Sequence, residues 1–284
     1  MKNEKDWLLT VANKGQGTKL FEIVFSASKP GTLIQLSLLI ILLILSSNSF
    51  SQNSDSIKVI SNFGGAVTVT NNGISFIPTF SLNEPAAIFD LSMGRKLTFE
   101  PQLRFSLEGK PWSFLFWWRY KMLKTDKFSF TLGCHPALSF KTITVTINEV
   151  PQEMIRVQRY LAGELVPNYF ITKNTSIGIY YLYSRCLEKE SVRNTNFVTF
   201  DANFSNIRLP DQFYMKFIPQ VYYLKMDKDD GFYFTSALTL ANKKTPFSVQ
   251  TVINKIIKTD IAASKNFVWN ISLIYTFKNK YVKI

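Results

Sequence analysis

The chain has 284 residues and a formal net charge of +13, so it holds one large domain or two small ones and favours an acidic partner or surface. Two cysteines, Cys134 and Cys186, make no disulfide framework, and with a single histidine they are too few for a tetrahedral zinc site. We therefore expect neither a metal ion nor a cofactor.

The N-terminal segment is typical of an export signal. Leu33 to Leu45 form an uncharged apolar run, and small polar residues follow at once. Small residues at Ser49 and Ser51 satisfy the two-position requirement of signal peptidase. Residues 1–51 are therefore predicted to be a cleaved leader and signal peptide, and residues 52–284 a single domain. The alternative is an N-terminal anchor helix, although the run is shorter than the roughly 20 residues that span a bilayer.

From residue 58 onward the sequence alternates with a period of two and shows no sustained helical pattern. In Leu97 to Glu108, LTFEPQLRFSLE, apolar residues alternate with polar or charged ones. Trp112 to Met122, Gly231 to Leu240 and Phe267 to Phe277 repeat the alternation, with large aromatic and aliphatic side chains on one side. The pattern predicts an all-β protein of amphipathic strands.

Short turn signals separate these strands, which makes consecutive strands antiparallel neighbours. They are NNG at 71–73, GRK at 94–96, EGKP at 108–111, KTD at 124–126, TKN at 172–174, LPDQ at 209–212, DKDDG at 227–231 and NKK at 242–244. The count is twelve or thirteen strands, and since bacterial barrels close with an even number we predict about twelve. The role of residues 58–70 stays open.

The connections alternate in length. Longer links are expected near residues 144–154, 186–194, 226–230 and 258–265, with tighter turns between them, which is the asymmetry of outer-membrane barrels. Even the longer links are modest, which argues against an elaborate receptor with folded-in loops.

Five prolines conflict locally with a strand assignment, because proline lacks the N–H that a ladder needs. They fall in the apolar phase of strand-like runs, where they could form bulges or bends that curve the wall. These residues are Pro78, Pro101, Pro136, Pro167 and Pro219.

The sides of the strands distinguish a membrane barrel from a soluble one. One side is almost wholly aromatic and aliphatic, and these side chains would overfill the interior of a small barrel if they pointed inward. The other side mixes polar residues with charges of both signs, as expected of a polar lumen. The last strand, VWNISLIYTF, ends in an aromatic residue, Phe277, before the tail KNKYVKI. In these features the chain resembles Gram-negative outer-membrane β-barrel proteins, whose C-terminal assembly signal ends in an aromatic residue. In that family the aromatic is usually the final residue, and the tail departs from this form.

The resemblance implies a transmembrane antiparallel up-and-down β-barrel in the outer membrane. Its expected partners are outer-membrane lipids, lipopolysaccharide and the barrel assembly machinery; the sequence leaves the oligomeric state open. Basic residues interleaved with aromatics could suggest nucleic-acid binding, but export removes that target.

Continuing the alternation places a set of charged residues on the lumen side. They are Asp90, Glu100, Arg104, Arg119, Lys121, Glu164, Asp201 and Lys216. Charges inside a narrow barrel must be paired or hydrated. They predict either a selectivity-determining constriction of a small-solute channel or a salt-bridged plug in a sealed barrel with a structural or envelope-assembly role.

His135 also points inward by phase, with Ser139 four residues along the same face. Such a pair could serve as base and nucleophile of a membrane-embedded lipid acyl hydrolase. In barrel enzymes of that kind the pair faces lipid and is spaced by two residues, which does not match, so a hydrogen-bonded lumen histidine is the alternative.

Two other features have simple structural interpretations. The aspartates of DKDDG lack the remaining ligands of a calcium loop and predict a solvated turn. Several aromatic residues are candidates for the belts at the membrane interfaces. These are Trp112, Trp117, Trp118, Tyr120, Tyr180, Tyr181, Tyr183, Tyr222 and Tyr223.

Overall fold

The computed structural model describes residues 60–77, 80–147, 150–188, 192–262 and 264–282. The predicted leader and signal peptide, residues 1–51, and Pro78 lie outside these ranges. Among the described residues no helix is long and apolar enough to cross a bilayer.

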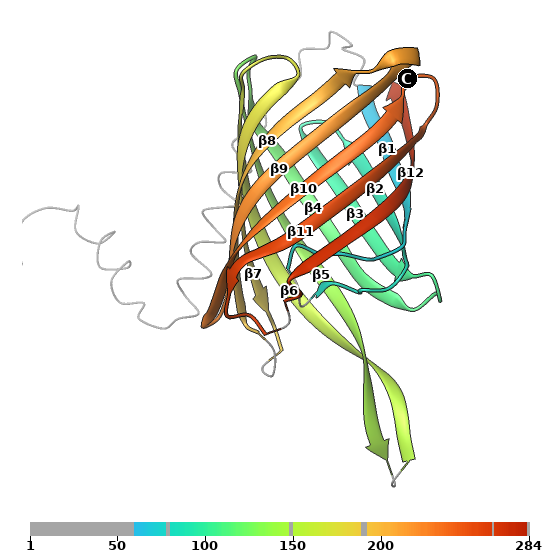
Figure 1. Ribbon diagram of the computed structural model, residues 1–284, viewed down its shortest axis with the longest axis vertical. Helices are drawn as coiled ribbons and strands as arrows, with labels where there is room; N and C mark the ends of the chain where they lie inside the picture. The colour runs from blue at the N-terminus through green and yellow to red at the C-terminus, as the bar shows by residue number, and fades with distance from the viewer. Residues whose placement is uncertain (1–59, 78–79, 148–149, 189–191, 263, 283–284) are drawn as a thin grey trace, which may run out of the picture. The chain divides into compact units, whose positions relative to one another are not determined.

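Twelve antiparallel strands close into one barrel, each paired with its neighbours in the sequence (Figure 1). The strands are β1 Ile60–Thr70, β2 Ala86–Gly94, β3 Leu97–Ser106, β4 Pro111–Lys124, β5 Phe128–Ile147, β6 Val150–Phe170, β7 Thr175–Cys186, β8 Asn194–Arg208, β9 Phe213–Met226, β10 Asp229–Asn242, β11 Phe247–Thr259 and β12 Phe267–Val282. The predicted strand number is confirmed. The segment whose role was open is the first strand, and it closes the barrel by pairing with β12 from Ile60↔Val282 to Thr70↔Ser272.

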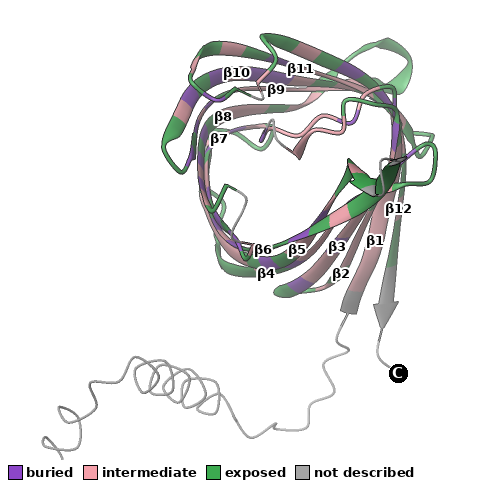
Figure 2. Ribbon diagram, turned by 90° about the horizontal axis from the view of Figure 1, so that it is seen from below, coloured by how far each residue is buried: buried purple, intermediate pink, exposed green. Residues whose placement is uncertain are grey.

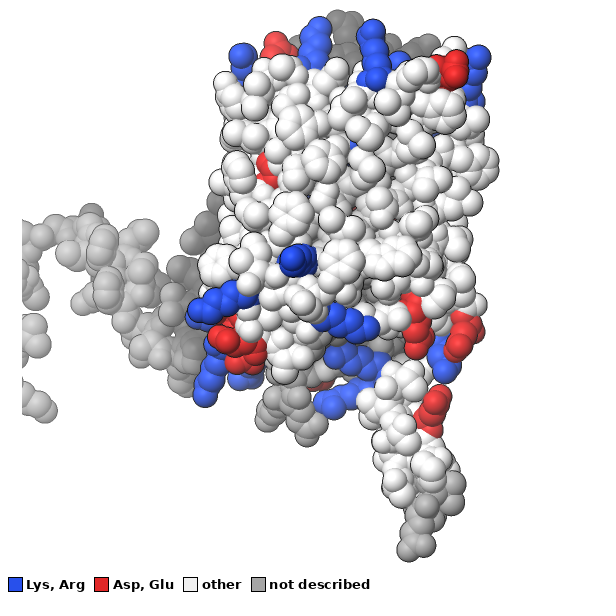
Figure 3. Space-filling view, viewed as in Figure 1, with Lys and Arg blue, Asp and Glu red and all other residues white. Residues whose placement is uncertain are grey.

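The apolar side of each strand faces outward. Leu97, Phe232 and Leu273 are each 52% exposed, although the same residues would be buried in a soluble barrel. Outward rings pack side by side along the wall, as Phe99 and Trp118 do at 4.6 Å between centroids. Figure 3 shows a wall with few charged side chains between two charged rims. Exposing so many apolar side chains to water is unfavourable by about 1.5–3 kcal/mol for each one. The predicted transmembrane barrel is therefore confirmed.

The two ends of the barrel differ, as predicted. Tight turns join the strands at the end that carries the C-terminus, and the longest connections, β1–β2, β7–β8 and β11–β12, lie at the opposite end. Two expected links were wrong. Residues 144–154 are mostly strand, because β5 and β6 stay paired up to Ile147↔Val150. Residues 226–230 form a tight turn, because β9 and β10 stay paired up to Asp229↔Met226. Since β4 pairs with β5 only as far as Ser139, and β7 with β6 only from Tyr160, the β5–β6 hairpin projects beyond the barrel (Figure 1).

The connection between β1 and β2 folds into the barrel, which contradicts the expectation against folded-in loops. Figure 2 shows chain inside the ring of strands. Ile77 is only 8% exposed, the ring of Phe76 stacks on that of Phe197 at 6.4 Å, and Phe80 meets Tyr160 edge-on at 5.0 Å. The loop turns inward because it carries three large apolar residues that find aromatic partners in the lumen.

Four of the five prolines lie in strands, on the outward side, and each interrupts one hydrogen-bonded ladder. Pro136 pairs with Leu161 on β6, but the β4–β5 pairing skips from Ala137 to Cys134. The others behave alike: Pro101 interrupts the β2–β3 ladder, Pro167 the β6–β7 ladder and Pro219 the β8–β9 ladder. None of these four has a register shift at its own position, so the bulge interpretation is wrong for them. The missing N–H leaves a gap in one ladder while the opposite ladder continues.

Candidate functional site

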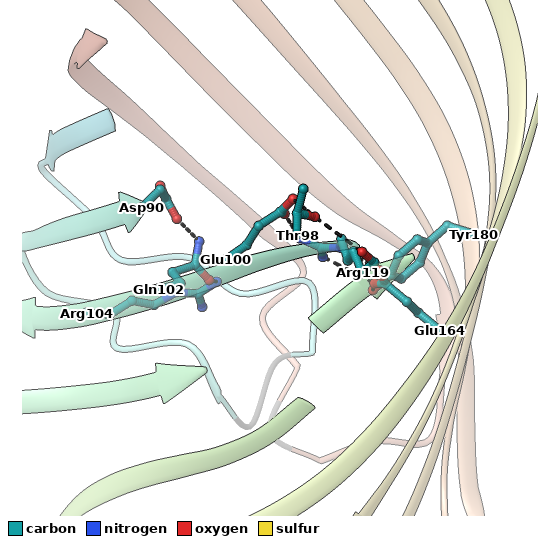
Figure 4. A network of polar contacts seen from close by, with 8 residues as sticks. All are labelled: Asp90, Thr98, Glu100, Gln102, Arg104, Arg119, Glu164 and Tyr180. Atoms are coloured by element: carbon teal, nitrogen blue, oxygen red, sulfur yellow. Dashed lines mark hydrogen bonds and ion pairs between the residues drawn. The ribbon is translucent and has the colours of Figure 1, made fainter. Parts of the chain in front are cut away.

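Alternation along β2 to β7 directs one charged residue after another into the lumen, where they form two groups (Figure 4). The first is centred on Arg119 of β4. Its Nη1 donates to Oε2 of Glu100 at 2.5 Å, and its Nε donates to Oε1 of Glu164 at 2.5 Å. Arg119 Nη2 and the hydroxyl of Tyr180 both donate to the other oxygen of Glu164, at 3.2 and 2.8 Å. Arg119 thus has a carboxylate on each side.

Glu164 reaches Arg119 across a glycine. β5 lies between β4 and β6, and Gly133 is the residue that pairs with Arg119 on one side and with Glu164 on the other. A Cβ at Gly133 would lie 2.4 Å from Oε1 of Glu164, so a side chain there would displace the Glu164 carboxylate. Sequence reasoning missed Gly133, because its role depends on the register of three strands.

The second group is centred on Arg104 of β3. Nη2 of Arg104 donates to Oε1 of Gln102, and Nε2 of Gln102 donates to Oδ1 of Asp90 on β2. The guanidinium lies 5.0 Å from the ring centroid of Trp112. Arg104 and Asp90 are therefore linked through an amide and not by a direct ion pair.

The remaining predicted lumen charges lie apart from these two groups. Lys121 donates to the carbonyl of Arg95 at 3.3 Å, in the exposed rim by the β2–β3 turn. Asp201 lines the lumen on β8, and Lys216 faces inward on the neighbouring β9, where it pairs with Thr239 of β10. No ion pair joins Asp201 to Lys216 in the described part of the chain. The predicted set is thus brought together only in part.

His135 and Ser139 lie inside the barrel but do not form a catalytic pair. The His135 ring packs on Trp117, with 3.8 Å between centroids, and its Nδ1 lies 3.4 Å from the carbonyl of Pro136. Ser139 is the cross-strand partner of Ser113. Within the described residues no hydrogen bond joins His135 to Ser139, so this geometry gives no support to a hydrolase.

An aromatic cluster fills the lumen near the end with the long connections. Its members include Phe197, Tyr222 and Tyr233, with the last two rings stacked at 4.7 Å and the Tyr222 hydroxyl donating to Oδ1 of Asn254 at 3.0 Å. Trp117, Tyr180 and Tyr222 are lumenal, so they were wrong as candidates for the interface belt, whereas Trp118, Tyr120 and Tyr183 face outward. Alternation alone could have separated the two sets.

Trp112 also lies inside, although its phase predicted an outward side chain. A register shift between Arg104 and Phe105 reverses the sides at the start of β4. As a result Trp112 is only 3% exposed, and its Nε1 donates to the carbonyl of Phe80 in the folded-in loop at 2.7 Å.

Between the charged wall and the opposite strands lies a cavity of about 1050 Å³. It reaches from Asn62 and Lys278, near the end that carries the C-terminus, to Phe76 and Phe80 of the loop. Both charged groups line it. The arrangement can hold or pass a small polar molecule, with the loop narrowing the far end.

No protein-family model matches the chain, and no curated protein matches its sequence. The solved structures that resemble the barrel include the KdgM porin in complex with disordered oligogalacturonate, at 9% identity and a TM-score of 0.45 over 76% of this chain and 99% of that one. The NanC porin is 12% identical, with a TM-score of 0.44 over 78% and 100%. The beta domain of the Bordetella autotransporter BrkA is 8% identical, with a TM-score of 0.42 over 76% and 98%.

Proposed function

We propose that this barrel is a channel of the Gram-negative outer membrane for small polar solutes. The observation that carries the proposal is the cavity of about 1050 Å³, which runs inside the barrel along a wall of charged and hydroxyl side chains. A barrel that served only as an anchor could fill this volume with side chains, whereas a hollow lumen with charged and hydroxyl side chains along one wall suits passage. The proposed orientation puts the long connections outside the cell and the tight turns in the periplasm.

In this proposal the folded-in loop determines the width of the channel. Phe76, Ile77 and Phe80 bridge from β1–β2 to the aromatic cluster on the other side of the lumen. Their removal leaves the strands and ladders intact, because none of the three pairs in the sheet. We expect the triple variant F76A/I77A/F80A to show a single-channel conductance at least roughly twofold above that of the unmodified barrel in planar bilayers.

The matched control is F89A/F105A, which removes two aromatic residues that pack edge-on at 6.1 Å on the outward face. Its conductance is expected to equal that of the unmodified barrel. If neither the unmodified barrel nor the loop variant carries steady current, the channel proposal fails.

The second candidate is a sealed barrel with a structural or envelope-assembly role. Two observations favour it: the aromatic cluster with the loop closes much of one end, and the β5–β6 hairpin offers an exposed ribbon to a partner. Absence of current in the loop variant would support this candidate.

A further inference from the structure

The two arginines of the lumen differ in how their charge is balanced. Arg119 makes two ion pairs, with Glu100 and with Glu164, both at 2.5 Å. Arg104 makes none within the described residues, since the carboxylate of Asp90 reaches it only through Gln102. The lumen wall thus holds one guanidinium with two carboxylates in contact and one with none in contact.

Arg104 also has an unused donor. Its Nε is buried and has no hydrogen-bond partner in the described structure, and the same is true of Oγ of Ser113. These two residues are direct cross-strand partners on β3 and β4, and Ser139 of β5 is the next residue in the row. All three line the cavity. A guanidinium and two hydroxyl-bearing residues, in register on three neighbouring strands, therefore border the same cavity.

The surroundings hold the guanidinium in place. Trp112 lies on it at 5.0 Å, and Gln102 accepts one of its N–H groups. A fixed guanidinium with free N–H groups matches the planar fork of a carboxylate, and hydroxyl groups can donate to the same oxygens.

We propose that Arg104, Ser113 and Ser139 form a binding site for the carboxylate of a small anionic solute. This inference rests on the proposed channel and names the class of its solute. The cavity is at the upper end of the size of small-molecule sites, so it accommodates a small-molecule solute. Binding gives Arg104 the carboxylate partner that Arg119 already has.

The charge of the rim at the tight-turn end agrees with an anionic solute. Eight basic residues and only two acidic ones lie in or beside the five turns there, and Figure 3 shows basic side chains along this edge. The basic residues are Arg95, Lys96, Lys124, Lys127, Lys173, Arg208, Lys243 and Lys244, and the acidic ones are Asp126 and Asp211. The cavity extends toward this rim, where Lys278 lines it. Such a field raises the local concentration of anions at the mouth.

The test uses the purified full barrel in detergent and sodium glucuronate as the probe, with glucose as its uncharged counterpart. Binding is followed by tryptophan fluorescence, because Trp112 lies against Arg104. We expect glucuronate to bind and R104Q to weaken it by about tenfold or more, the loss for one charge-assisted contact. R104K, which keeps the charge but loses the fork, is expected to lie between the two. K216Q removes a different lumen charge, and its affinity for glucuronate is expected to lie within about twofold of that of the unmodified barrel. This control separates binding at a specific site from attraction by the general positive field.

S113A provides a second test, because it removes one hydroxyl with little risk to folding; we expect a several-fold loss of affinity. Heat-modifiable mobility on gels checks that each variant is a closed barrel. The inference is overturned if glucose binds as tightly as glucuronate, if folded R104Q binds as the unmodified barrel does, or, should R104Q not fold, if S113A has no effect. Binding without any channel current would instead overturn the proposed function and leave the site standing.

Discussion

Replacing Glu164 by Gln tests whether the Arg119 group stabilises the barrel. The Glu164 side chain is fully buried and that of Arg119 is 27% exposed. In E164Q an NH₂ group replaces one oxygen. Because both oxygens of Glu164 accept from Arg119, the new donor faces the guanidinium whichever oxygen is replaced, and the counter-charge is lost. Glu100 still holds Arg119 at 2.5 Å, so the charge of Arg119 keeps one partner.

The magnitude follows from these contacts. Breaking a buried ion pair by removing one partner costs about 3–5 kcal/mol, and a charge-assisted hydrogen bond contributes about 1.5–3 kcal/mol. Because Glu100 remains, we expect E164Q to lower the free energy of unfolding by about 2–3 kcal/mol. The double variant R119M/E164Q is expected to lose less than the sum of the two single variants, since it leaves neither charge buried without its partner.

The measurement is urea unfolding in phospholipid vesicles, followed by tryptophan fluorescence and heat-modifiable mobility. E108Q is the control, because Glu108 is 71% exposed and pairs with Lys110 only at 3.7 Å; we expect a change below about 0.5 kcal/mol. If E164Q unfolds like the unmodified barrel, or if the effects of R119M and E164Q simply add, the network does not stabilise the fold and this reasoning is wrong.

Two further predictions concern the wall and a loop. L273R places a charge on the outward face and is expected to destabilise the barrel by about 2–4 kcal/mol, whereas T276R, which points into the cavity, should cost less than about 1 kcal/mol; equal costs in vesicle unfolding would refute the assignment of sides. In the β9–β10 turn, partial burial acts against the charged form, but hydrogen bonds from the backbone N–H groups of Arg193 and Asn194 keep the pKa of Asp227 below its usual range. Because the pKa of Asp227 is lower in the folded chain than in the unfolded chain, the contact stabilises the fold fully at pH values above the unfolded pKa. This stabilisation is lost as the pH falls through the folded pKa, so acid should increase hydrogen exchange at Arg193 and Asn194. D227N should abolish this pH dependence; an unchanged acid response in D227N would show that another group titrates.

Alternation was sufficient for the main features of the fold because the side-chain period of a strand is two in any sheet. It separated the outward Leu97 and Leu273 from the inward Glu100 and Arg119, and the turn signals gave the strand number. It did not separate a turn from a folded-in loop. The apolar residues of ISFIPTF, around Phe76 and Phe80, are compatible with a strand and equally with a loop that packs inside the barrel. Only the positions of the lumenal aromatic residues that they contact distinguish the two.

The sequence by itself determined a twelve-stranded barrel with an oily outer face and a charged interior, because each strand carries that information in its own alternation. Tertiary structure alone decided which charges meet. Register across β3 to β6 joins Arg119 to residues 19 positions before it and 45 after it, and the same register leaves Arg104 beside two serines without a carboxylate. Contacts between distant strands depend on how far each strand slides along its neighbour, and a local pattern does not contain that quantity.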